Sequence, residues 1–291
     1  MAQRTWTSDR MPSQAGRTVV ITGGAGGIGL RAAQAFARHG AQVIIGARGE
    51  TKARQAVAAI GPDAEWLPLD LADLASVERF AGRLTERGQP IDVLVNCAGV
   101  MAIPRRELTV DGFEKHFGTN HLGHFALTGR LRPLLKERVI TVSAQSARSA
   151  TIRPGNLQLE RDYAPMRAYG NSKLANILFA VELNHHAPVL SLPVHPGTAP
   201  TDIQQYGSNR VTNALGRVIM RAVGQPLEYV ADPITFAATT PDATADSYIA
   251  PTGPFELGGS PGFVKLPPAA LDAGLRATLW RESERLTGVR Y

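Results

Sequence analysis

The sequence has only one cysteine, Cys97, among its 291 residues. No disulfide can therefore form within the chain, and a chain of this length buries enough apolar surface to fold without one. A lone cysteine is also typical of a reducing compartment, so we expect a cytoplasmic protein. No spacing of histidines, cysteines and carboxylates predicts a metal site.

Long apolar runs and dense basic blocks are missing as well. No stretch of about 18 apolar residues predicts a membrane span. Residues 1–16 are polar and lack the apolar centre of a signal peptide, so we expect a disordered leader there. The formal net charge is +6, but basic residues are not interleaved with aromatics, which argues against a nucleic-acid partner. The charge predicts either a dispersed basic surface or attraction of a phosphorylated ligand.

What the sequence does contain is a regular alternation of two patterns. Short runs rich in β-branched residues alternate with amphipathic helical stretches. This alternation predicts an α/β protein with a doubly wound parallel sheet, the Rossmann fold. The expected strands are 17–22, 41–47, 64–69, 91–95, 138–143 and 189–195, and the expected helices are 27–39, 50–60, 74–87, 111–135 and 166–186.

No linker or repeat divides the chain. The stretch 250–268, rich in proline and glycine, resembles a domain boundary, but only a short helical tail (269–286) follows it. A tail of that length cannot build a core of its own. We therefore expect one domain over residues 17–291, with the tail packed back on it.

The first expected strand runs directly into a glycine-rich turn, TGGAGGIG (22–29). Glycines let a backbone turn tightly and approach a pyrophosphate, and the helix that follows supplies free N–H groups and a positive dipole end. The alternative is a plain tight turn, but the position between a strand and a helix favours a dinucleotide site. The residues expected to bind are Gly23, Gly26, Gly27, Ile28 and Gly29.

The end of the second expected strand distinguishes NAD(H) from NADP(H). An NAD site usually has a carboxylate here for the ribose 2′-hydroxyl, whereas this sequence has Ala47 and then Arg48. A guanidinium can hold a 2′-phosphate by charge-assisted hydrogen bonds. The sequence therefore predicts NADP(H), unless Arg48 is merely a solvated loop residue.

Several segments resemble those of one enzyme family. The turn 22–29 resembles TGxxxGIG, 96–99 (NCAG) resembles NNAG, 120–125 resembles an NHLGHF helix, and 169–173 (YGNSK) resembles YxxxK. Together with the tail 279–288 they span nearly the whole chain. The sequence thus resembles the short-chain dehydrogenase/reductases, within them the retinol-dehydrogenase-like branch. The resemblance implies further contacts to the cofactor, at its adenine, its ribose or the loop over its nicotinamide: Asp70, Leu71, Asn96, Ala98, Gly99, Tyr169, Lys173, Pro196, Gly197 and Thr201.

Tyr169 and Lys173 lie four residues apart on an expected helix, so they share a face. A phenol titrates near pH ~10, which is too high for easy acid–base work at neutral pH, and a nearby ammonium lowers that value. The resemblance implies that Tyr169 gives or takes the proton of a carbonyl or alcohol. It also implies that Lys173 holds the nicotinamide ribose and that Asn120 anchors a proton-relay water. His121 and His124, beside Asn120, are interpreted as packing residues.

The resemblance carries two further expectations. The family pairs through the long helices that bear the Asn and the Tyr, so a homodimer or homotetramer is expected. Residues of about 200–225 cap the substrate pocket in the family. This region is therefore expected to touch a small-molecule substrate through Ile203, Tyr206, Ile219 and Met220.

One catalytic position departs from the family pattern. The resemblance predicts a serine where this chain has Ala144, so the hydroxyl that polarises the substrate oxygen is missing there. Ser143 is expected to face the opposite way because side chains alternate along a strand. Ser146, two positions further on, is the candidate replacement, and losing such a donor costs ~10²–10³ in rate.

Three functions remain open at this point. The first is an NADP(H)-dependent oxidoreductase, of secondary metabolism, that transfers hydride between nicotinamide and a carbonyl or secondary alcohol of a small organic substrate. The second is a non-redox tailoring enzyme, such as a cyclase or isomerase, that uses the nucleotide structurally. The alanine at position 144, in place of the expected serine, suggests this alternative. The third is a non-catalytic NADP(H) sensor, against which the intact pair of Tyr169 and Lys173 argues.

Overall fold

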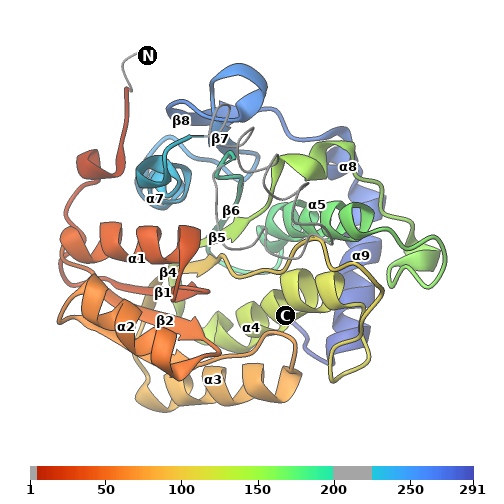
Figure 1. The fold of residues 1–291 in the computed structure, drawn as a ribbon, viewed down its shortest axis with the longest axis horizontal. Coiled ribbons are helices and arrows are strands. Elements are labelled where there is room, and N and C mark those ends of the chain that lie inside the picture. The colour runs from red at the N-terminus through yellow and green to blue at the C-terminus, as the bar shows by residue number, and fades with distance from the viewer. Residues whose placement is uncertain (1–4, 199–224) are drawn as a thin grey trace.

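A central sheet of eight strands runs through the molecule, a computed structural model that describes residues 5–198 and 225–291 (Figure 1). The strand order is β3-β2-β1-β4-β5-β6-β7-β8, and β8 pairs antiparallel with β7 while the other neighbours are parallel. The strands are β1 (Thr18–Thr22), β2 (Gln42–Ala47), β3 (Ala64–Pro68), β4 (Ile91–Asn96), β5 (Leu135–Val142), β6 (Leu190–Val194), β7 (Tyr248–Pro251) and β8 (Pro261–Val264).

Helices cover both faces of this sheet, as the doubly wound prediction requires. Successive β1 residues face opposite cores: Val19 packs with α1, α2 and α7, whereas Val20 packs with α3, α4 and α5. Burial on both faces explains why the strands read as continuous apolar runs. The helices are α1 (Gly27–Arg38), α2 (Glu50–Ile60), α3 (Leu74–Arg87), α4 (Gly123–Leu131), α5 (Pro165–Leu183), α7 (Asp232–Thr239), α8 (Pro268–Leu271) and α9 (Ala273–Thr287). The predicted single α/β domain of Rossmann type is confirmed.

Two expected segments differ from the structure. The stretch 111–135 is helical only in its middle, as a π-helical turn (Phe117–Leu122) followed by α4. Pro133 lies in a short 3₁₀ turn that ends the helix, because proline cannot continue the hydrogen-bond pattern. The stretch 250–268, which resembles a domain boundary in sequence, contains part of β7 and all of β8.

The expectation of a disordered leader does not match residues 5–16. Both the backbone N–H and the hydroxyl of Ser8 donate to Asp232 Oδ1 at 2.9 Å. The ring of Trp6 meets Phe236 edge-on at 5.3 Å between centroids, and Met11 is buried. These contacts fix the segment against α7, and residue spacing along the chain gives no sign of them.

The C-terminal helix α9 packs against α4 and α5 (Figure 1). Trp280 stacks on Phe179 at 5.9 Å and meets Phe125 at 5.0 Å between ring centroids. Ser283 Oγ lies 2.8 Å from His121 Nε2. The C-terminal tail is therefore packed back on the domain, as expected. Among the described residues, no helix is both long and apolar enough to cross a bilayer.

Candidate active site

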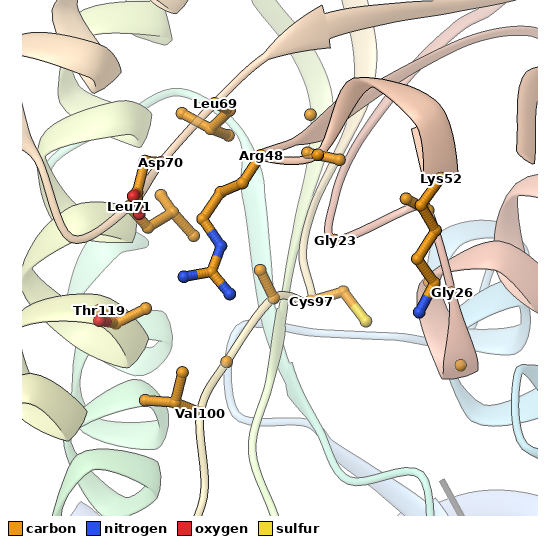
Figure 2. A pocket seen from close by; sticks show the side chains of 18 of the residues that line it. Gly23, Gly26, Arg48, Lys52, Leu69, Asp70, Leu71, Cys97, Val100 and Thr119 are labelled. Carbon is orange, nitrogen blue, oxygen red and sulfur yellow. The ribbon is translucent and has the colours of Figure 1, made fainter. Parts of the chain in front are cut away.

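A pocket of about 330 Å³ opens at the carboxyl ends of β1, β2 and β4 (Figure 2). Its floor is the turn between β1 and α1, where α1 begins at Gly27 and presents its unpaired N–H groups. A Cβ atom added at Gly29 would lie 2.6 Å from the carbonyl oxygen of Gly23, so only glycine lets the helix approach the turn this closely. Free N–H groups at the start of a helix, directly after a glycine-rich turn, fit a pyrophosphate.

Most of the predicted cofactor residues converge on this pocket. Asn96 does not line it: its side-chain amide donates to Thr128 Oγ1 at 3.0 Å, inside the protein. Pro196 and Gly197 follow β6 and do not line it either. Thr201 and the expected cap at about 200–225 lie outside the described residues. The predicted residues that do line the pocket are Gly23, Gly26, Gly27, Ile28, Gly29, Arg48, Asp70, Leu71, Ala98 and Gly99.

Two cationic side chains lie on the wall of this pocket (Figure 2). Arg48 extends into it from the end of β2, as expected. Lys52, in the first turn of α2, was missed by sequence reasoning; its Nζ lies 3.2 Å from the Cβ position of Gly26. The sequence feature that could have indicated Lys52 is a second basic residue, four positions after Arg48. Asp70 is the only carboxylate among the described residues that line the pocket.

Tyr169 and Lys173 are both buried on α5. The Lys173 ammonium lies 5.9 Å from the centroid of the Tyr169 ring and donates to the carbonyl of Val142 at 3.0 Å. Burial raises the pKa of the Tyr169 phenol above its ordinary value, so the lowering expected from the Lys173 ammonium is not found. Burial also lowers the pKa of Lys173 to about 8. At neutral pH the phenol therefore carries its proton and most of the lysine is charged.

Gly99 joins this pair to the cofactor pocket. A Cβ atom at Gly99 would lie 3.0 Å from Asn120 Oδ1 and 3.4 Å from Lys173 Nζ. Asn120 makes two hydrogen bonds to the backbone of Val100. Its amide donates to the carbonyl of Val100 at 3.0 Å, and its Oδ1 accepts the N–H of Val100 at 2.7 Å. The predicted residues Asn120 and Lys173 thus lie together behind Gly99, although neither they nor Tyr169 line the pocket themselves.

The structure separates the two serines near Ala144. The Ser143 hydroxyl donates to the carbonyl of Lys173 at 2.7 Å, so it serves the backbone of α5. Ser146 lies in a 3₁₀ turn, Gln145–Ser149, and its Oγ is buried with no hydrogen-bond partner within the described part of the chain. Of the two, only Ser146 has a hydroxyl left for a ligand.

A second cavity, of about 930 Å³, lies beside this turn. Its wall is formed by the connection between β5 and α5 and by the first turns of α5. Ser146 lines it, and so does Gly170, the neighbour of Tyr169. A molecule in this cavity would lie next to the helix turn that carries the predicted acid–base group.

The chain matches the family model of the short chain dehydrogenases over residues 17–209. It is 36% identical to polyprenol dehydrogenase from Mus musculus, in an alignment that covers 96% of this chain and 86% of that protein. It is 34% identical to retinol dehydrogenase 13 from Homo sapiens, over 97% of this chain and 89% of that protein.

Solved structures show the same fold. An uncharacterized protein from Mycobacterium Paratuberculosis superposes with a TM-score of 0.82 at 39% identity, covering 98% of each chain. RhlG from Pseudomonas aeruginosa, in an active-site complex with NADP, superposes with a TM-score of 0.67 at 26% identity, covering 84% of this chain and 98% of that one. The chain therefore belongs to the short-chain dehydrogenase/reductase family, and retinol dehydrogenases are among its relatives.

Proposed function

We propose that the protein is an NADP(H)-dependent oxidoreductase that transfers hydride between nicotinamide and a carbonyl or secondary alcohol of a small organic substrate. The observation that supports this proposal is the position of Gly99, which lines the dinucleotide pocket and has Asn120 and Lys173 directly behind it. The relatives are named dehydrogenases, and the non-redox alternative gains no support from them. The cytoplasmic location and the role in secondary metabolism stay predictions.

Three side chains share the acid–base and hydrogen-bonding roles in this reaction. When bound, nicotinamide supplies or accepts the hydride. In the direction of reduction, Tyr169 donates its phenolic proton to the substrate oxygen, and in the direction of oxidation it takes that proton back. Lys173 stabilises the phenolate by its charge. Ser146 donates a hydrogen bond to the substrate oxygen in place of the serine missing at Ala144.

The choice of NADP(H) rests on Arg48 and Lys52. Two cations on the pocket wall favour a ribose 2′-phosphate, and no carboxylate replaces Arg48 to repel it. Further support comes from the NADP complex of RhlG, a protein of the same fold.

Titration with NADPH and with NADH, followed by calorimetry, tests this choice. A hydrogen bond to a charged group corresponds to about 10- to 100-fold in affinity, so wild type is expected to bind NADPH at least about 10-fold more tightly. Arg48→Asp is expected to erase or reverse the preference. Arg54→Asp is the matched control, since Arg54 lies nearby on α2, is exposed and paired with Glu50, and does not line the pocket. Tighter binding of NADH by the wild type would refute the choice.

A further inference from the structure

Two buried histidines lie three residues apart beside Asn120, and they face different parts of the protein. Burial lowers the pKa of both His121 and His124 to about 3, so both rings are neutral at physiological pH. His121 contacts the C-terminal helix through Ser283. His124 contacts the end of β1 instead, where the phosphate-binding turn begins.

The hydrogen bonds of His124 fix which nitrogen carries its proton. Nδ1 lies 2.8 Å from the backbone carbonyl oxygen of Asn120. A carbonyl can only accept, so Nδ1 bears the hydrogen. Nε2 of the neutral ring is then an acceptor, and it lies 2.8 Å from Thr22 Oγ1. The Thr22 hydroxyl therefore donates to Nε2; its other possible acceptor, the carbonyl of Val95, is more distant at 3.4 Å.

Thr22 extends this chain of hydrogen bonds to β4. Its Oγ1 accepts the N–H groups of Cys97 at 2.8 Å and of Ala98 at 3.0 Å. One donated and two accepted bonds use the full capacity of a hydroxyl. The residue after Thr22 opens the glycine turn, and the residue after Ala98 is Gly99, where an added Cβ atom would lie within 3.4 Å of both Asn120 and Lys173.

The carbonyl at the other end of this chain belongs to the π-helical turn Phe117–Leu122. Such turns depart from the regular helical hydrogen-bond pattern and are frequent at functional sites. The Asn120 side chain is meanwhile committed to Val100 and to Ser172 Oγ, at 2.9 Å from its amide. The side chain and the carbonyl of Asn120 are thus both hydrogen-bonded, and the carbonyl has the His124 ring as a partner.

We propose that His124 is a positioning residue. As a ring with its hydrogen on Nδ1, it sets the separation between the dinucleotide-binding turn at Thr22 and the Asn120 carbonyl, and through Gly99 it aligns Lys173 and Tyr169 with the cofactor. This inference rests on the proposed function for its catalytic consequence. The link from Thr22 through His124 to Asn120 stands on geometry by itself.

Four variants separate positioning from packing. His124→Leu removes both hydrogen bonds, whereas His124→Gln keeps a donor and an acceptor on one side chain. Thr22→Val breaks the chain at its other end. His121→Leu is the matched control, an equally buried imidazole that bonds to Ser283 of α9 and packs against phenylalanines, away from Thr22. We would measure the dissociation constant of NADPH, turnover with all-trans-retinal as probe, and the melting temperature of each variant.

His124→Leu and Thr22→Val are expected to lower turnover by about 10- to 100-fold, the scale of a misplacement of about 1 Å, and to weaken NADPH binding. His124→Gln is expected to recover part of this loss. His121→Leu should lower the melting temperature and leave NADPH binding within about twofold. Equal effects of His121→Leu and His124→Leu on NADPH binding and turnover would overturn the proposal, because both rings would then act through stability alone.

Nitrogen NMR of histidine-labelled wild-type protein tests the link without any substrate. The expected spectrum shows a neutral ring for His124 with its hydrogen on Nδ1 from about pH 5 to about pH 9, and Thr22→Val should displace the Nε2 resonance. The opposite tautomer, or a ring that titrates near its ordinary pKa, would overturn the inference. Should wild type fail to bind NADPH, the proposed function fails, and this spectrum still decides the link.

Discussion

Replacing Ser146 by alanine is expected to slow carbonyl reduction strongly while leaving the fold intact. Its Oγ is buried in a cavity-lining turn and has no partner among the described residues. Under the proposal that this hydroxyl donates to the substrate oxygen, no hydrogen bond within the described part of the chain has to break first. The neighbouring Ser143 cannot do this, because its hydroxyl is bonded to the carbonyl of Lys173.

The expected size of the effect follows from the same geometry. Removing one preorganised donor to a developing oxyanion costs about 10²–10³ in kcat. The free energy of unfolding should rise or stay unchanged. No hydrogen bond within the described part of the chain is lost, and a hydroxyl buried without a partner is removed. The assay is NADPH oxidation at saturating carbonyl substrate, with urea unfolding on the same sample.

Two comparisons make this prediction refutable. Ser149→Ala is the control, an exposed serine of the same turn that lines the same cavity, and its kcat should stay within about twofold. Ala144→Ser should change little if Ser146 already donates. Unchanged turnover in Ser146→Ala, together with a gain of about 10- to 100-fold in Ala144→Ser, would show that the donor is missing and that Ser146 does not replace it.

Three other predictions concern charge, the C-terminal helix and assembly. Because the pKa of Lys173 is lowered to about 8, its ammonium is lost as pH rises through about 8, and kcat/KM for reduction should fall there; Lys173→Arg should lack this limb, and a limb that persists contradicts the assignment. Trp280→Ala should lower the free energy of unfolding in urea by ~3–5 kcal/mol, as for a buried aromatic, and a loss below ~1 kcal/mol contradicts its packing role. Light scattering at micromolar concentration should report a homodimer or homotetramer, as pairing through the helices of Asn120 and Tyr169 implies, and a monomer would contradict it.

The parallel strands and their helices could be predicted well from the sequence, because the pattern of apolar residues in each segment follows from which of its faces are buried. Val19 and Val20 face different cores, and such strands are apolar throughout. The glycines of the 22–29 turn were informative for a similar reason, since a Cβ at Gly29 would meet the backbone of Gly23. These features are local, so residue type alone indicates them.

Features made by distant contacts could not be predicted this way. The order in residues 5–16 depends on Ser8 meeting Asp232, more than two hundred residues away. The strands β7 and β8 are only four residues each and contain proline or glycine, so they carry no alternation to detect.

In the candidate site, too, local features could be predicted from the sequence and features made by distant contacts could not. Tyr169 and Lys173 follow from helical spacing, whereas the placement of Lys52 over Gly26 requires the fold. The sequence could not predict that His124 contacts Thr22, because Thr22 lies on β1, about a hundred residues earlier in the chain. Sequence reasoning named the two candidate serines, and only the hydrogen bond of Ser143 to Lys173 distinguishes them.

The most direct test of the central claim is the stoichiometry of hydride transfer during turnover. NADPH carrying deuterium at the transferred position is incubated with the protein and its carbonyl substrate, and the alcohol formed is analysed by mass spectrometry alongside the loss of reduced cofactor. The account predicts one deuterium in each product molecule and one NADPH consumed for each product, with both lost in Tyr169→Phe. Product formation with no deuterium gained and no net change in the cofactor would contradict it.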